Sequence, residues 1–177
     1  MSADGFLEPI GPGGLDQVLA DVARRRWTGS LRFVGPRPAS LFFDDGRLYF
    51  AVSESQALTA KELASAGIDH TLWQEAGRRP GAKGKFAEEL IDLGCDRTAV
   101  ERFVDSRLAA CIVSLRVDAV DGFTRSNGRH GFGTAVAFAV DRYLIKPPAR
   151  FSDDTLVSLI RDVAASVTLY AIAQARS

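Results

Sequence analysis

The stretch ASLFFDDGRLYFAVS, residues 39–53, decides the fold of this chain because it predicts a β-hairpin. Two largely apolar runs flank Asp45-Gly46, and an Asp-Gly step between such runs is among the strongest local signals of a hairpin turn. Gly46 tolerates the positive φ that the turn requires. We expect one face to carry Leu41, Phe43, Leu48, Phe50 and Val52. We expect the other face to carry Phe42, Tyr49 and Ala51, so both faces are largely apolar. The hairpin is therefore expected to be covered on both sides or to present one face to a partner.

The adjacent carboxylates of this stretch raise the question of an acid–base pair. Neighbouring residues of a turn point in different directions, and no His, Lys or cluster of metal ligands lies nearby in the sequence to tune either carboxylate. We therefore interpret Asp44-Asp45-Gly46 as a bend, with Asp45 and Gly46 as structural turn residues.

The residues before the hairpin predict a helix and a first strand. An N-terminal tail of residues 1–14 ends in the helix-breaking sequence GPGG. Apolar residues then recur with the period of an amphipathic helix at Leu15, Val18, Leu19 and Val22. From Thr28 the period changes to two, so residues 28–53 are expected to form a strand followed by the hairpin.

The middle of the chain, residues 55–120, has a helical pattern that is broken into short pieces and one long helix. Thr59, Asp69 and Asp96 are placed to cap helices, and Gly67 is placed to end one. The long helix is expected over residues 97–119. One broad face of it carries Val100, Phe103, Val104, Arg107, Leu108, Cys111, Ile112 and Leu115.

Residues 122–146 allow two alternatives. Residues 122–125 and 134–137 can form a second hairpin around the loop SNGRHGFG. The second arm can instead begin a helix that Thr134 caps, and we favour this helix.

A last helix is predicted over residues 151–177, after the break KPPARFSDD. Ser152 is placed to cap it, and we expect it to dock on the domain or to mediate homodimerisation through residues 152–177. The sequence therefore predicts an α+β fold: a small antiparallel β-sheet with hairpins near 30–52 and 122–137, a helical middle region and a C-terminal helix.

The composition is that of an ordinary globular protein. Lys and Arg together number 22 and so do Asp and Glu, whereas nucleic-acid-binding proteins normally carry a basic excess. No apolar run approaches the roughly 18 residues of a membrane span. The N-terminal residues lack the pattern of a signal peptide, and two cysteines make no disulfide scaffold. We expect a cytoplasmic protein without a membrane span.

No motif in the sequence predicts a catalytic, cofactor or metal site. A Walker-type loop needs Gly, four residues and Gly-Lys-Ser/Thr, but RRPGAKGKF has Arg79 at the first Gly and Phe86 at the hydroxyl position. The two histidines and two cysteines are too far apart in sequence for a local zinc motif. We therefore expect neither an enzyme nor a bound cofactor.

The clearest charged feature is a basic loop, residues 78–85. Its basic residues are Arg78, Arg79, Lys83 and Lys85. Short helices and a hairpin would also suit a winged-helix module, so our second hypothesis is a winged-helix-like nucleic-acid-binding regulator that uses this loop. Zero net charge and nearby acidic residues count against it, so we regard a nucleic-acid partner as the weaker alternative.

The hairpin region resembles the opening of the DUF4388 family, also called the PATAN domain. The family pattern is Thr-Gly-x-Leu, a strand, and then small-x-Leu-x-Phe-x-x-Gly-x-Leu/Ile-x-x-Ala. The matching positions are Thr28, Gly29, Leu31, Leu41, Phe43, Gly46, Leu48 and Ala51. The segment GKFAEELIDLG and the later Gly122-Phe123 are also similar, so we expect one DUF4388-like domain over residues 15–146.

The resemblance implies a non-catalytic interaction module of bacterial signalling, associated with motility, pili, polarity and small Ras-like GTPases. It implies an adaptor or regulatory protein whose partner is a receiver domain, a pilus ATPase, a small GTPase or a roadblock protein. Because aromatic side chains dominate interface energetics, the expected partner contacts include Trp27, Phe42, Tyr49 and Trp73. A core position is the competing interpretation for each of them.

Overall fold

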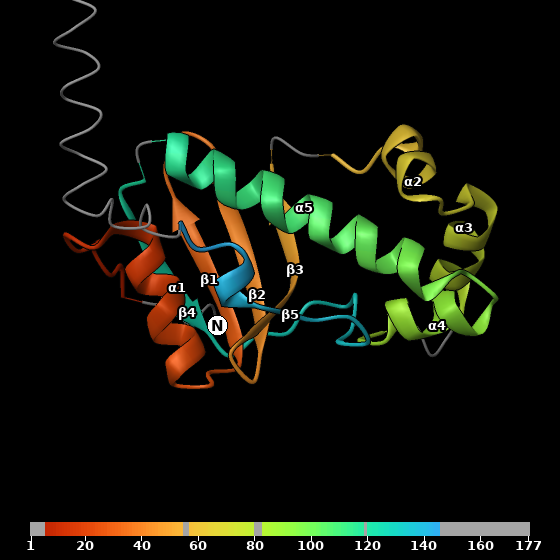
Figure 1. Cartoon of the computed structure of the whole chain (residues 1–177), viewed down its shortest axis with the longest axis horizontal. Coiled ribbons are helices and arrows are strands. Elements are labelled where there is room, and N and C mark those ends of the chain that lie inside the picture. The colour runs from red at the N-terminus through yellow and green to blue at the C-terminus, as the bar shows by residue number, and fades with distance from the viewer. Residues whose placement is uncertain (1–5, 55–56, 80–82, 119, 146–177) are drawn as a thin grey trace, which may run out of the picture. The chain divides into compact units, whose positions relative to one another are not determined.

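The computed structural model divides into two units, Met1–Leu144 and Ile145–Ser177 (Figure 1). The described residues are 6–54, 57–79, 83–118 and 120–145. The predicted C-terminal helix over residues 151–177, and the homodimerisation expected through it, lie outside the described residues.

The centre of the first unit is a five-stranded antiparallel sheet in the order β4-β1-β2-β3-β5 (Figure 1). Its strands are β1 (Gly29–Val34), β2 (Ala39–Asp44), β3 (Arg47–Ser53), β4 (Gly122–Ser126) and β5 (Phe138–Ala139). The three strands that are consecutive in sequence form the middle of the sheet, and the two later strands extend its opposite edges. The predicted α+β class with a small antiparallel sheet is confirmed.

The Asp45-Gly46 turn joins β2 to β3, as predicted. Both residues have positive φ, 50° and 74°, which a primed hairpin turn requires. A Cβ atom on Gly46 would lie 2.8 Å from the carbonyl oxygen of Ala23. The Asp45 carboxylate accepts a hydrogen bond from Nε of Arg26 at 2.8 Å, and its N–H donates to Oγ1 of Thr28 at 2.9 Å. These contacts make the carboxylate part of the bend and not of a paired acid–base site.

A β-bulge in the β2–β3 pair changes which side chains share a face. Phe42 lies opposite Phe50, whereas Phe43 lies opposite Leu48, so β3 carries one extra residue here. Residues that lie directly opposite each other share a face, so Phe50 lies on the face of Phe42 and not on that of Leu48. The expectation from strict alternation is therefore wrong, because a one-residue slip reverses the faces of all residues beyond it.

The described part of the chain contains five α-helices (Figure 1). They are α1 (Gly14–Arg24), α2 (Ala60–Ala66), α3 (His70–Arg78), α4 (Phe86–Asp92) and α5 (Arg97–Val117). The predicted caps are confirmed, because Thr59, Asp69 and Asp96 each accept a hydrogen bond from an N–H of the first turn that follows. The C-terminal half of α5 crosses the sheet, and the three short helices α2–α4 gather around its N-terminal half.

Residues 122–145 form neither the hairpin nor the helix that the sequence suggested for residues 122–146. β4 pairs with β1 and β5 pairs with β3, so the two strands lie at opposite edges of the sheet. The only helical part is a short 3-10 helix, η2 (Val140–Arg142), among the residues described there. The segment 127–137 instead crosses from one edge of the sheet to the other as an irregular chain. We refer to it as the crossing segment.

The residues expected to form an N-terminal tail join the sheet in part. The N–H of Glu8 donates to the carbonyl of Phe123 at 2.8 Å, and the reverse bond measures 2.9 Å. The carboxylate of Glu8 also accepts a hydrogen bond from Nε of Arg125 at 2.8 Å. This bridge ties the start of the chain to the outer edge of β4.

Candidate functional site

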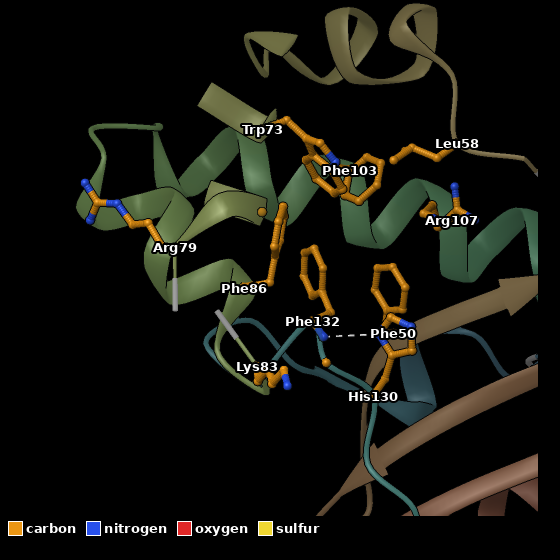
Figure 2. A pocket seen from close by; sticks show the side chains of 12 residues that line it. Phe50, Leu58, Trp73, Arg79, Lys83, Phe86, Phe103, Arg107, His130 and Phe132 are labelled. Carbon is orange, nitrogen blue, oxygen red and sulfur yellow. Dashed lines mark hydrogen bonds between the residues drawn. The ribbon is translucent and has the colours of Figure 1, made fainter. Parts of the chain in front are cut away.

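A cavity of about 580 Å³ lies beside β3, where the crossing segment meets α3, α4 and α5 (Figure 2). Its volume lies within the roughly 300–1,000 Å³ of ordinary ligand pockets. The residues that line it are Phe50, Leu58, Trp73, Gly77, Arg79, Lys83, Phe86, Phe103, Arg107, His130, Gly131 and Phe132. Six of these twelve residues have aromatic rings, so the cavity is suited to bind apolar groups.

The crossing segment is held at the cavity by backbone hydrogen bonds to α4. The first N–H groups of a helix have no partner within the helix. Here the carbonyls of Gly131 and Phe132 accept from the N–H groups of Phe86 and Ala87, at 3.3 and 2.7 Å. These bonds give the first two N–H groups of α4 their acceptors and place the Phe132 ring in the cavity wall.

Phe132 is the centre of an aromatic cluster that forms this wall. Figure 2 shows its ring between those of Phe50 and Phe86, with centroid separations of 4.4 and 5.9 Å. The rings of Phe103 and Trp73 lie 6.1 and 6.3 Å from it. Tilted and offset ring pairs at such distances are favourable, which makes the wall a packed unit and not a loose loop.

His130 is part of the same wall and carries a defined tautomer. Its ring lies 4.9 Å from that of Phe42 and stacks on Phe50 at 4.5 Å. Its Nδ1 accepts a hydrogen bond from the N–H of Phe132 at 3.1 Å, so the proton of the neutral ring is on Nε2. Burial, and next the charge of Arg107, lower the pKa of His130, so the ring is neutral at neutral pH. Its Nε2–H has no hydrogen-bond partner among the described residues.

Every ionisable side chain in the described lining is basic. Arg107 is only 6% exposed, and its Nη1 donates to both carboxylate oxygens of Glu62 at 2.9 and 3.0 Å. Its guanidinium also lies 5.8 Å from the ring centroid of Phe50 and 5.7 Å from that of Phe103. Arg107 is therefore fixed by a carboxylate outside the cavity while its cation faces the aromatic wall.

The other two cations come from the predicted basic loop. Nη1 of Arg79 lies 3.3 Å from a carboxylate oxygen of Glu89, and its Nη2 lies 3.9 Å from one of Glu75. Both carboxylates lie outside the lining. Lys83 is exposed and forms no ion pair with the residues described. Arg79 is therefore compensated locally, and the uncompensated positive charge of the basic loop comes from Lys83 and from the exposed Arg78 and Lys85, which form no ion pair with the described residues.

The structure brings three of the predicted contact residues to this cavity: Trp73, Arg79 and Lys83. Arg78 and Lys85 are exposed but do not line it. The basic loop and one predicted aromatic contact thus meet at a single site.

The other predicted contacts are used in packing. Trp27 is half-buried, 6.2 Å from the ring of Phe43 and covered by the guanidinium of Arg125. Phe42 is half-buried behind His130. Tyr49 is fully buried, and its hydroxyl accepts the N–H of His130 at 2.7 Å. A core role therefore accounts for these three aromatic residues in this structure.

Most of the cavity wall was not among the residues that the sequence predicted as partner contacts. The missed residues are Phe50, Leu58, Phe86, Phe103, Arg107, His130 and Phe132. One signal was present: Arg107 is a charged residue within the apolar face predicted for the long helix. A second was the sequence RHGFG, which places a histidine and a phenylalanine among loop glycines.

No protein-family model, no curated protein and no solved structure matches this chain. The resemblance to the DUF4388 family therefore stays a prediction. In the described part of the chain no helix is both long and apolar enough to cross a bilayer, and no group of His, Cys, Asp or Glu is arranged to hold a metal ion.

Proposed function

We propose that this protein is a non-catalytic cytoplasmic adaptor that receives apolar side chains of a partner protein in the aromatic cavity. The observation that carries the proposal is the cavity itself, a 580 Å³ space with an aromatic wall built on three helices, a strand and the crossing segment. The resemblance to DUF4388 adds bacterial signalling in motility, polarity, pili or small-GTPase regulation as the setting. Receiver domains, pilus ATPases, small GTPases and roadblock proteins are the candidate partners.

The energetics of apolar burial support this use of the cavity. Fully burying one Leu or Phe side chain contributes about 1.5–3 kcal/mol, and residues that enter well-packed pockets dominate most interfaces. The rings that receive such a side chain are already ordered by one another. Little conformational entropy is therefore lost on the protein's side when a partner binds.

Nucleic-acid binding is the second candidate. Arg79 and Lys83 flank the aromatic wall, and single-stranded nucleic acids bind to combinations of cations and aromatic rings. The zero net charge of the chain counts against it. A steep loss of binding with rising salt would favour this second function.

Gly77 offers a way to close the cavity without deleting its wall. Gly77 lies in α3, and a Cβ atom added there would meet nothing closer than Cε2 of Phe86 at 3.7 Å. A Gly77→Leu side chain therefore extends into the cavity without a backbone clash. A Gly77→Ala variant shows by its unfolding transition that a side chain is tolerated at this position.

The test compares tagged wild-type protein with Gly77→Leu in a pull-down from nuclease-treated lysate of the source cells, read by mass spectrometry. We expect a defined protein to be recovered by the wild type and lost with Gly77→Leu, and the purified pair to bind directly. Recovery of the same proteins by both forms would contradict the use of the cavity. Recovery only of nucleic acid, without nuclease, would favour the second function.

A further inference from the structure

We infer that the partner segment bound by the cavity is acidic: a stretch of a protein with two or more apolar side chains and flanking Asp or Glu residues. This inference rests on the proposed function and adds the chemistry of the partner to it. It is carried by the charges around the cavity and by the donor that His130 leaves unused.

The first argument is the sign of the lining. Its ionisable side chains are Arg79, Lys83, Arg107 and His130, and none of the described lining residues is a carboxylate. This contrasts with the chain as a whole, in which acidic and basic residues are equal in number. Glu62, Glu75 and Glu89 pair with the two arginines from outside the lining, so the uncompensated charge beside the cavity is that of Lys83 and of the exposed loop residues Arg78 and Lys85. Positive charge next to an apolar cavity attracts and orients a negative segment, and it repels a positive one.

The second argument is the position of each cation. Arg107 is buried and paired with Glu62, so it is not a contact for a carboxylate of the partner. Arg79 is 41% exposed on its side chain but already pairs with Glu75 and Glu89, whereas Lys83 is exposed at the mouth and forms no ion pair with the described residues. Lys83, together with the exposed Arg78 of the same loop, is therefore the group that can meet carboxylates flanking an inserted apolar side chain.

The third argument is hydrogen bonding at the wall. Nδ1 of His130 is used by the N–H of Phe132, which leaves Nε2–H as a donor. In the neutral tautomer this ring nitrogen donates and does not accept. The ring is thus suited to bind a carbonyl or carboxylate oxygen of the partner segment.

The size of the cavity indicates more than one anchoring side chain. A space of about 580 Å³ is of the order that holds whole drug-sized ligands. Two apolar side chains of one segment, for example one helical turn apart, would use the space better than one. We therefore expect a short apolar pair within an acidic sequence and not a single isolated residue.

The test selects peptides from a random display library on immobilised wild-type protein, with removal of those that also bind Gly77→Leu. We expect the surviving pool to combine apolar pairs with an excess of Asp and Glu. A synthetic peptide from this pool should bind Arg78→Glu/Lys83→Glu at least about tenfold more weakly than wild type, because these two exposed cations have no carboxylate partner among the described residues. Lys61→Glu is the matched control, because Lys61 is exposed on α2 outside the cavity, and it should leave binding unchanged.

The remaining outcomes separate the acidic inference from the proposed function on which it rests. A pool that depends on the open cavity but is neutral or basic would overturn the acidic inference and leave the proposed function standing. If no selected pool distinguishes wild type from Gly77→Leu, both the inference and the proposed function are overturned. A poly-dT oligonucleotide that binds wild type but not Gly77→Leu would also overturn the inference, because the anion would then be phosphate.

Discussion

Replacing Phe132 tests whether the crossing segment is packed into the aromatic wall as the structure describes. Its side chain is 3% exposed and its ring lies 4.4–6.3 Å from four other rings. Truncating a buried Phe to Ala costs about 3–5 kcal/mol in a closed core. Because this ring borders a cavity, we expect the lower end, about 3 kcal/mol, for Phe132→Ala.

A conservative variant separates ring contacts from simple burial. Phe132→Leu keeps most of the apolar volume but loses the pairs with the neighbouring rings. Each such pair contributes about 0.5–1.5 kcal/mol, and pairs that share one ring do not add fully. We therefore expect Phe132→Leu to lower the free energy of unfolding by about 1–2 kcal/mol.

Urea denaturation followed by circular dichroism measures both values from the midpoint at constant slope. Phe6→Ala is the control, because that side chain is 86% exposed and should change stability by less than about 0.5 kcal/mol. A loss below about 1 kcal/mol for Phe132→Ala would refute the reasoning. It would mean that the crossing segment does not depend on this ring for its position.

Three further predictions test other parts of the structure. Gly46→Ala should destabilise the protein by about 2 kcal/mol or more in the same assay, because φ is +74° and the new Cβ would meet the Ala23 carbonyl; an unchanged midpoint would contradict the turn geometry. Because burial lowers the pKa of His130 in the folded state, the unfolded chain binds the proton more readily. The free energy of unfolding should therefore fall as the pH drops below 6.5, the ordinary pKa of histidine, towards the lower pKa of His130 in the folded protein. His130→Gln should lose this part of the pH dependence, and an unchanged pH dependence in the variant would contradict the assignment. Burial raises the pKa of Cys111 to about 11 and also raises that of Cys95, so a thiol reagent at neutral pH should label neither in the native protein and both in denaturant; rapid native labelling would show that these cysteines are accessible.

The local parts of the fold could be predicted from the sequence because local rules determine them. The Asp45-Gly46 turn needs positive φ, which residue type alone indicates. The caps at Thr59, Asp69 and Asp96 follow from the polar residue that precedes each apolar helical run. In each case the deciding contacts lie within a few residues of chain.

The parts of the fold that the sequence did not predict correctly depend on contacts between distant segments. The bulge in β3 is an additional residue that an alternating pattern does not reveal, and it moved Phe50 to the other face. The pairing of β5 with β3 involves only two residues of each strand, too few for a periodic signal. The crossing segment is fixed by α4, which precedes it by some forty residues in the chain.

Only some residues of the candidate site could be predicted from the sequence, because the site also depends on contacts between distant segments. Trp73, Arg79 and Lys83 were singled out as an aromatic residue and two members of a basic loop, without a common location. Their meeting with Phe132 and Arg107 requires the packing of α3, α4, α5 and the crossing segment around one space. Sequence patterns gave the residue types, and tertiary structure determines which of them share a site.

The most direct test of the binding cavity is a titration of ¹⁵N-labelled protein with the peptide selected on the wild type, followed by amide chemical shifts. We predict the largest shifts at cavity residues such as Gly77, Gly131 and Phe132, with small shifts at Gly122 on the far edge of the sheet. The same peptide should cause no shifts in Gly77→Leu. Shifts that centre on another surface, or that persist in Gly77→Leu, would contradict the account.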